Sequence, residues 1–170
     1  MSSDSPETAR PEGFRRVSAA LADKSHPHPP RWLDATARTS QEAADALGVA
    51  LGQIAKSVVF RRKEDEAAVL VIASGDRRVD EKKLKTHTGA LGRADADYVK
   101  ARTGFSIGGV SPLGFAPVDG LAQPRVFIDR ELFRFDVIWA AAGHPNGVFP
   151  MTPDELVALT GAPVIDVAQD

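Results

Sequence analysis

The stretch IAKSVVFRRKEDEAAVLVIAS, residues 54–74, carries the strongest indication of the fold. Two apolar runs, residues 54–62 and 67–74, flank the charged tetrapeptide KEDE, and this pattern is typical of two strands joined by a turn. Both runs are almost continuously apolar, which indicates strands that are buried on both faces of a sheet. Residues 54–74 therefore predict a hairpin inside a covered sheet.

Helices are expected on both sides of this hairpin in the sequence. Phe14, Val17 and Leu21 recur at helical spacing, and the prolines of HPHPP, residues 26–30, end that helix. Thr39 and Glu42 form a capping box that starts a second helix, which stops at Gly48. Similar start and stop signals predict helices within residues 79–89, 94–104 and 152–161.

Further strands are expected at residues 31–38, 124–132, 135–143, 147–151 and, as a final strand or tail, 162–170. Strands outnumber helices and are clustered along the chain. The pattern predicts an α/β (α+β) fold, in which a mixed β-sheet or partly closed barrel is surrounded by helices.

Length and composition fit one domain over residues 13–170, preceded by a frayed segment over residues 1–12. The 170 residues contain no cysteine, which excludes disulfides, cysteine nucleophiles and thiolate metal sites. No window is apolar for the roughly 18 residues that a membrane span needs, and the polar N-terminus lacks a signal sequence. We therefore expect a cytoplasmic protein without a membrane partner.

The formal net charge of −2 argues against broad, non-specific binding of nucleic acid, and DNA is not an expected partner. A local basic patch for one nucleic-acid end remains compatible with this charge. The residues Arg77, Arg78, Lys82, Lys83 and Lys85 form such a cluster around an expected helix start. This cluster is either a contact for nucleic-acid phosphates or a solvated helix face.

Two features within the expected core are candidates for chemistry. Lys56 interrupts an apolar strand, and a buried ammonium is costly unless it is paired; the alternative is a lysine whose ammonium reaches solvent at the strand start. The stretch TGFSIGGVSPLGF, residues 103–115, places Gly108 and Gly109 after a strand-like FSI. These glycines either expose amides to an oxyanion or form a tight turn between strands.

Histidines supply two weaker candidates. His144 lies in the loop sequence GHPNG and is either a substrate or proton-transfer group or an exposed loop residue. His26 and His28 have the spacing of a metal-binding pair, but no acidic or thiol partner completes a site, which favours a solvated loop. No dinucleotide-binding, P-loop, HExxH or nucleophile-elbow signature is present, and no metal or cofactor is expected.

The segments TSQEAADALGV, QIAKSVVFR, GDRRVDEKKL and TGFSIGGVSPLGF, in this order and spacing, resemble the YbaK/ProX/EbsC family. Its members are free-standing relatives of the editing domain of bacterial prolyl-tRNA synthetase, and the resemblance extends roughly over residues 39–159. It implies a mixed, barrel-like sheet surrounded by helices. It also implies hydrolysis of the ester between a wrong small amino acid and the 3′ end of a tRNA, of the tRNA(Pro) type, with prolyl-tRNA synthetase as a further partner.

The resemblance also implies the site residues. Lys56 matches the pocket lysine of the family, and Gly108, Gly109, Val110, Ser111 and Pro112 match its glycine-to-proline loop. Ser57, Pro112, His144 and Asn146 are expected to contact substrate, with a core-facing orientation as the alternative for Ser57. The basic cluster around residues 77–85 becomes a candidate contact for tRNA phosphates. Ala141 and Val148 stand near positions where the cysteine-specific branch carries serine and aspartate, which argues against specificity for cysteine. The alternative function is a non-catalytic module that binds a tRNA end or a synthetase.

Overall fold

One eight-stranded mixed sheet organises the computed structural model, which describes residues 10–35 and 37–170. The helices are α2 (Glu12–Asp23), α3 (Ser40–Leu47), α4 (Glu81–Thr88), α5 (Ala96–Thr103) and α6 (Pro153–Thr160), with the 3-10 helices η1 (Leu51–Gln53) and η2 (Arg130–Arg134). The strands are β1 (Arg31–Trp32), β2 (Ile54–Arg62), β3 (Ala68–Ser74), β4 (Leu91–Arg93), β5 (Arg125–Asp129), β6 (Ile138–Ala141), β7 (Gly147–Met151) and β8 (Val164–Ile165). Residues 1–9 of the segment expected to fray lie outside the description, and Glu12 already belongs to α2.

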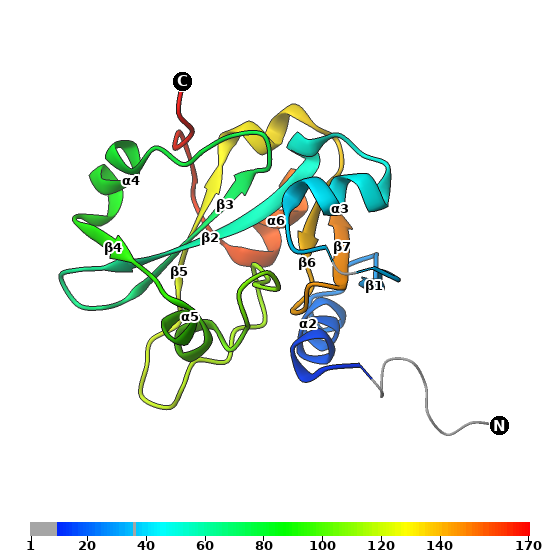
Figure 1. The fold of residues 1–170 in the computed structure, drawn as a ribbon, viewed down its shortest axis with the longest axis horizontal. Coiled ribbons are helices and arrows are strands. Elements are labelled where there is room, and N and C mark those ends of the chain that lie inside the picture. The colour runs from blue at the N-terminus through cyan, green and yellow to red at the C-terminus, as the bar shows by residue number, and fades with distance from the viewer. Residues whose placement is uncertain (1–9, 36) are drawn as a thin grey trace.

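The strand order is β1-β7-β6-β2-β3-β5-β8, and β4 pairs with β2 beside this path. Strand β2 is antiparallel to β3 and β4 and parallel to β6, so the sheet is mixed, as the sequence predicts. Figure 1 shows β2 as the long strand at the centre, from which β6 and β7 splay away on one side. This divergence positions the site described below.

The predicted hairpin is confirmed, with Lys56 opposite Ala73 and Arg61 opposite Ala68. Strand β3 is buried along its whole length, as its apolar sequence predicts. The expectation of burial on both faces is wrong for β2, in which only Ile54 and Ala55 are buried. The remainder of β2 is partly exposed, and residues 56–59 of this part border a pocket.

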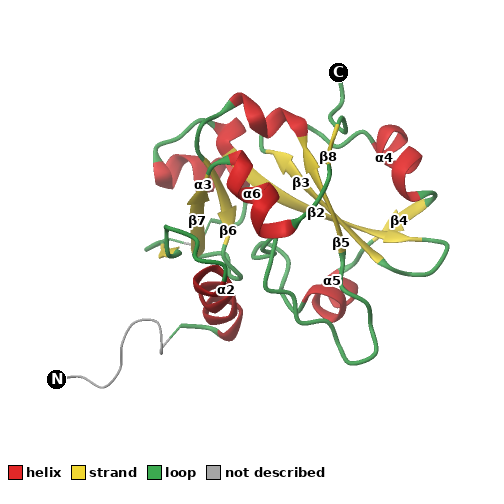
Figure 2. Ribbon diagram, turned by 180° about the vertical axis from the view of Figure 1, so that it is seen from behind, coloured by secondary structure: helices red, strands yellow, loops and turns green. Residues whose placement is uncertain are grey.

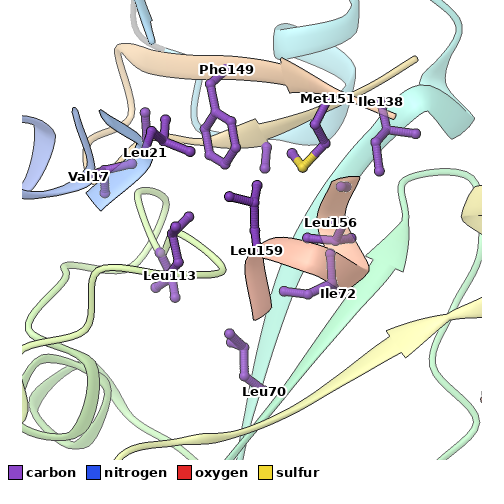
Figure 3. Close-up of a cluster of buried hydrophobic side chains, with 14 of the residues drawn as sticks. Val17, Leu21, Leu70, Ile72, Leu113, Ile138, Phe149, Met151, Leu156 and Leu159 are labelled. Carbon is purple, nitrogen blue, oxygen red and sulfur yellow. The ribbon is translucent and has the colours of Figure 1, made fainter. Parts of the chain in front are cut away.

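Alternate residues of β3 enter two different cores, as the two-residue period of a strand requires. Leu70 and Ile72 pack with α6, α2 and the sheet strands β6 and β7, and Figure 3 shows this cluster. The intervening residues Val69, Val71 and Ala73 pack on the opposite face with Leu84 of α4. Figure 2 shows α6 lying across the face of the sheet that Figure 1 turns away from the viewer.

The predicted helix starts are confirmed because each rests on local hydrogen bonds. Thr39 and Thr152 form capping boxes with Glu42 and Glu155, in which side chain and backbone exchange hydrogen bonds. Asp80 caps α4 by accepting hydrogen bonds from the amides of Lys82 and Lys83. No helix within the described part of the chain is both long and apolar enough to cross a membrane.

The glycine-rich stretch differs from its prediction, because residues 104–124 contain neither helix nor strand. The expected FSI strand is therefore wrong. Phe105, Val110 and Leu113 are buried and anchor this loop in the larger core, where Figure 3 shows Leu113. Arg16 of α2 also holds it, since its Nε donates to the Gly114 carbonyl at 2.7 Å and its Nη2 to the Gly104 carbonyl at 3.1 Å.

Candidate active site

A pocket of about 400 Å³ lies where β6 diverges from β2. The two strands pair only where Ile54 and Ala55 meet Trp139 and Ala140. Beyond that point the space between them is lined by β2 residues 54–59, by the chain at residues 37–40 ahead of α3, and by the glycine-rich loop. The lining is mostly apolar, and its polar side chains come chiefly from β2 and the start of α3.

Lys56 lines this pocket and is partly buried. Its ammonium makes no hydrogen bond or ion pair with any described residue. Burial lowers the pKa of Lys56, and the positive charge of Arg78 lowers it further, against the opposing carboxylates of Asp129 and Asp76. A cation that has lost part of its hydration without gaining a partner is suited to an anionic ligand or transition state.

Ser57 lines the same pocket, and its hydroxyl oxygen is buried without a hydrogen-bond partner among the described residues. The alternation along β2 places its side chain on the face opposite to that of Lys56. Ser57 therefore combines the two orientations expected from the sequence. Its hydroxyl is buried, as in the core-facing alternative, and the residue also lines the pocket. A buried hydroxyl without a partner is unfavourable by about 1–3 kcal/mol, which makes it a candidate for contact with a ligand.

Only part of the glycine-to-proline loop reaches the pocket. Gly108 and Val110 line it, whereas Gly109, Ser111 and Pro112 do not and are buried behind it. The Gly109 amide donates to the Ser106 carbonyl at 3.0 Å, and the Ser111 hydroxyl accepts from the Leu113 amide at 3.3 Å. The backbone of this loop thus has both a wall-forming part and a packing part.

The two adjacent glycines of this loop are needed for different reasons. A Cβ on Gly109 would lie 2.7–2.9 Å from backbone atoms of His144, so the GHPNG loop passes directly against it. Gly108 has a positive φ of 93°, a conformation that favours glycine, and a Cβ there would meet only Pro145 Cγ at 3.5 Å. The close approach at Gly109 is therefore to another loop of the protein.

His144 and Asn146 do not line the pocket, although Pro145 between them does. The His144 ring stacks on Trp32 with centroids 4.9 Å apart, and its Nδ1 accepts a hydrogen bond from the Asn146 amide at 3.0 Å. The Asn146 side chain donates to the Leu33 carbonyl at 2.9 Å. Burial lowers the pKa of His144. These contacts hold the loop that backs Gly109.

The basic cluster around α4 divides into two groups. Arg77 pairs with Asp76 and Glu131, and the Lys83 ammonium contacts Asp166, Asp170 and the Ala168 carbonyl. Ion pairs engage these two cations within the fold. The side chains of Arg78, Lys82 and Lys85 are exposed and make no ion pair with a described residue, and Arg78 lies close enough to act on the Lys56 pKa.

The metal-binding hypothesis for His26 and His28 finds no support in their surroundings. The two rings meet edge to face with centroids 5.9 Å apart, and His26 Nε2 donates to the Pro150 carbonyl at 2.8 Å. Within residues 10–35 and 37–170, no group of histidine, aspartate and glutamate residues is arranged to hold a metal ion.

Sequence reasoning missed several residues that line the pocket, and three of them bear on ligand binding. Arg38 and Trp139 line it from the start of α3 and from β6, and Ile107 lines it although its side chain is 58% exposed. The exposure of Ile107 is known only from the structure, because the letters FSIGG do not distinguish an exposed isoleucine from a buried one. No local pattern distinguishes Arg38 or Trp139, because their place depends on the divergence of β6 from β2.

Comparison with known proteins identifies the family. A family model for the aminoacyl-tRNA editing domain matches residues 34–159. The uncharacterized protein YwhH of Bacillus subtilis (strain 168) is 36% identical over 140 residues, which cover 81% of this chain and 85% of that protein. The proline–tRNA ligase of Pelotomaculum thermopropionicum is 39% identical over 90 residues, or 52% of this chain and 15% of the ligase.

Solved structures agree with these sequence matches. The crystal structure of a candidate trans-editing enzyme for prolyl-tRNA synthetase has a TM-score of 0.84 and 37% identity, covering 95% of this chain and 100% of that one. The crystal structure of hypothetical protein APE2540 has a TM-score of 0.81 and 27% identity over 91% of this chain and 99% of that one. Together with the family match over residues 34–159, these likenesses show that the chain belongs to the aminoacyl-tRNA editing domain family.

Proposed function

We propose that this protein is a trans-editing aminoacyl-tRNA deacylase, which hydrolyses the ester between a small non-cognate amino acid and the 3′ end of a tRNA(Pro)-type tRNA. The observation that carries the proposal is the partly buried Lys56 ammonium, which makes no hydrogen bond or ion pair with any described residue and lines one pocket with Gly108 and Val110. The family supports the same chemistry. Water is the second substrate, and the products are a free amino acid and a tRNA with a free terminal hydroxyl.

Ester hydrolysis passes through a tetrahedral oxyanion, and preorganised positive charge and amides stabilise such a species. Lys56 supplies a positive charge that the protein does not neutralise by direct contact. The backbone at Gly108 can approach the reacting ester because no side chain stands there. The chain contains no cysteine, and no serine is paired with a histidine among the described residues, so attack by water without a covalent acyl-enzyme fits these residues.

Selectivity follows from the shape of the pocket. Its walls are mainly aliphatic, from residues such as Ala43, Ala55 and Val99. An apolar pocket distinguishes ligands that differ by one methylene by only about 1–3 kcal/mol. Exclusion of the larger, correct amino acid by steric contact is therefore the stronger means of discrimination, with small non-cognate amino acids as substrates.

Two arginines near the pocket are the cations that we assign to the tRNA end. Arg38 lines the pocket and is exposed, and Arg78 lies near Lys56. These side chains can contact the terminal phosphates, whereas Lys82 and Lys85 on α4 offer weaker, more distant contacts. Prolyl-tRNA synthetase is the partner that we propose to supply tRNA selectivity, and the cytoplasm is the compartment where both substrates occur.

Deacylation assays on a panel of mischarged tRNAs test this function. Alanyl, cysteinyl, seryl, threonyl and 2-aminobutyryl tRNAs are incubated with purified protein, and release of the amino acid is followed over many turnovers. Hydrolysis of at least one small-residue tRNA, with the correctly charged prolyl-tRNA spared, is the expected result. Stoichiometric binding without turnover would instead identify a non-catalytic tRNA-binding module, and a panel left wholly intact would contradict the proposal.

A further inference from the structure

The edge of β2 has a gap in its pairing beside the pocket. On this edge, the register with β6 ends at Ala55 and the register with β4 begins at Phe60. The intervening residues 56–59 pair with β3 on their other side and line the pocket. A strand edge without a partner presents backbone donors and acceptors that another extended group can bind.

The backbone of Ser57 is directed into this gap. The Gly75 amide donates to the Ile54 carbonyl at 2.8 Å, and the Arg62 amide donates to the Ala67 carbonyl at 2.9 Å, both on the side of β3. Successive residues of a strand direct their N–H and C=O groups to opposite sides. The even-numbered residues of β2 therefore face β3, and Ser57 turns its N–H and C=O toward the gap.

The Ser57 hydroxyl gives an independent indication of a ligand at the same place. Its oxygen is buried, adjoins the pocket and has no hydrogen-bond partner among the described residues. Three polar groups of one residue thus meet the pocket without a strand partner. Such groups are nearly always satisfied by protein, water or ligand.

We infer that this gap binds the aminoacyl group of the substrate as a strand of a single residue. The Ser57 carbonyl accepts a hydrogen bond from the α-ammonium, and the Ser57 amide donates to the acyl carbonyl. An amino acid ester matches the gap because its nitrogen and its carbonyl belong to one residue, as in an antiparallel hydrogen-bonded pair. This inference rests on the proposed function and names the part of the substrate that the site recognises.

Two consequences follow from this pairing. The Ser57 carbonyl should favour a free α-ammonium over the amide N–H of N-acylated and peptidyl esters, because a charged donor makes the stronger hydrogen bond. The Ser57 amide also becomes an oxyanion donor, because the acyl oxygen that it contacts gains negative charge during attack by water. Ser57 performs both roles through its backbone, independently of its side chain.

Amide hydrogen exchange, measured by NMR at single residues, tests the pairing without turnover. The probe is 3′-alanylamino-3′-deoxyadenosine, in which an amide replaces the ester, and the control is its N-acetylated form. In the free protein, we expect the Ser57 amide to exchange much faster than those of Lys56 and Val58, which face β3. At saturating probe, we expect exchange at Ser57 to slow by about tenfold or more, the size of effect that one added hydrogen bond produces.

The control compound tests the role of the α-ammonium, and a Ser57 variant tests whether the backbone alone makes the contact. The N-acetylated compound should slow Ser57 exchange less than the free-amino probe, because its donor is uncharged. Ser57→Ala should retain the protection by the free-amino probe because its backbone is intact. Binding of the probe without slower exchange at Ser57 would overturn the inference, and so would equal protection by the N-acetylated compound or failure of the probe to bind. Deacylation by the same preparation reports separately on the proposed function, which survives any of these results if turnover persists.

Discussion

A Cβ placed on Gly109 would lie 2.7 Å from the Cα of His144, so the glycine-rich loop and the GHPNG loop pass each other with no room for a side chain. The contact joins residues 35 positions apart in the sequence and backs the wall of the pocket. Gly109 therefore serves packing, while its neighbour Gly108 borders the ligand space. The same substitution should therefore destabilise the protein for a different reason at each glycine.

Gly109→Ala is expected to reduce the free energy of unfolding by about 1–3 kcal/mol, because the added methyl overlaps backbone that has nowhere to move. Gly108→Ala is the matched control, since its Cβ would have space and its cost arises from the positive φ, about 1–2 kcal/mol. Urea unfolding of both variants measures the two values. A Gly109→Ala protein as stable as the natural one would show that the loops do not pack as described.

Lys56→Met should lower kcat/KM for deacylation by about 10²–10³-fold, the usual effect of removing one group that stabilises an oxyanion. Its thermal stability should be retained, because Lys56 makes no hydrogen bond or ion pair with a described residue. Lys56→Arg is the charge-preserving control and should keep more activity than Lys56→Met. Equal activity of Lys56→Met and the natural protein would remove Lys56 from the mechanism.

The same lysine predicts a dependence of stability on pH. Burial and Arg78 place the pKa of Lys56 below its ordinary 10.5, so between these two values the unfolded chain binds more protons than the folded one. The contribution of Lys56 to the free energy of unfolding is therefore least favourable below the folded pKa and improves as pH rises toward 10.5. Lys56→Met should be at least as stable as the natural protein at pH 7, with a difference that shrinks at alkaline pH in thermal unfolding.

Deacylation should decline as pH rises through the lowered pKa of Lys56, because the neutral amine no longer stabilises the oxyanion. The measurement is kcat/KM against pH after subtraction of uncatalysed ester hydrolysis. In Lys56→Arg, whose guanidinium stays charged, the alkaline decline should be absent. A decline of the same shape in Lys56→Arg would assign it to another group.

Ser57→Ala measures what the Ser57 hydroxyl contributes to the stability of the protein and, separately, to ligand binding. Removal of a buried hydroxyl that lacks a partner should leave the free energy of unfolding unchanged or raise it by up to about 1 kcal/mol. A loss of affinity for the alanylamino-adenosine probe would add a side-chain contact to the backbone pairing. Chemical unfolding and calorimetric titration of the same sample give the two quantities, and clear destabilisation would show that the hydroxyl is satisfied in the free protein.

Arg78→Ala and Lys83→Ala form a matched pair of charge deletions in the basic cluster. Arg78 has no ion-pair partner among the described residues and acts on the Lys56 pKa, so its loss should raise KM for tRNA several-fold and reduce the salt dependence of binding. Lys83 is engaged with Asp166 and Asp170, so its loss should leave KM nearly unchanged and slightly reduce stability. The reverse order of effects in steady-state kinetics would place the tRNA contact on α4.

Much of the fold followed from short-range chemistry. The capping boxes at Thr39 and Thr152 and the hairpin of residues 54–74 depend on neighbours within a few positions, and all three are confirmed. The strand expected near Phe105 was wrong because its apolar residues anchor an irregular loop in the core. Apolar content alone does not distinguish a strand from such a loop, since both bury apolar side chains in the core.

The sequence by itself determined the helices, the central hairpin, the candidate Lys56 and, through its motifs, the family. Only the tertiary structure decided which candidates share a pocket, because that depends on where β6 leaves β2. It brought Lys56, Ser57 and Gly108 together, set His144 behind Gly109 and engaged Lys83 in ion pairs. The physical reason is that capping and strand alternation act between near neighbours, whereas a pocket is formed by residues that only long-range packing makes adjacent.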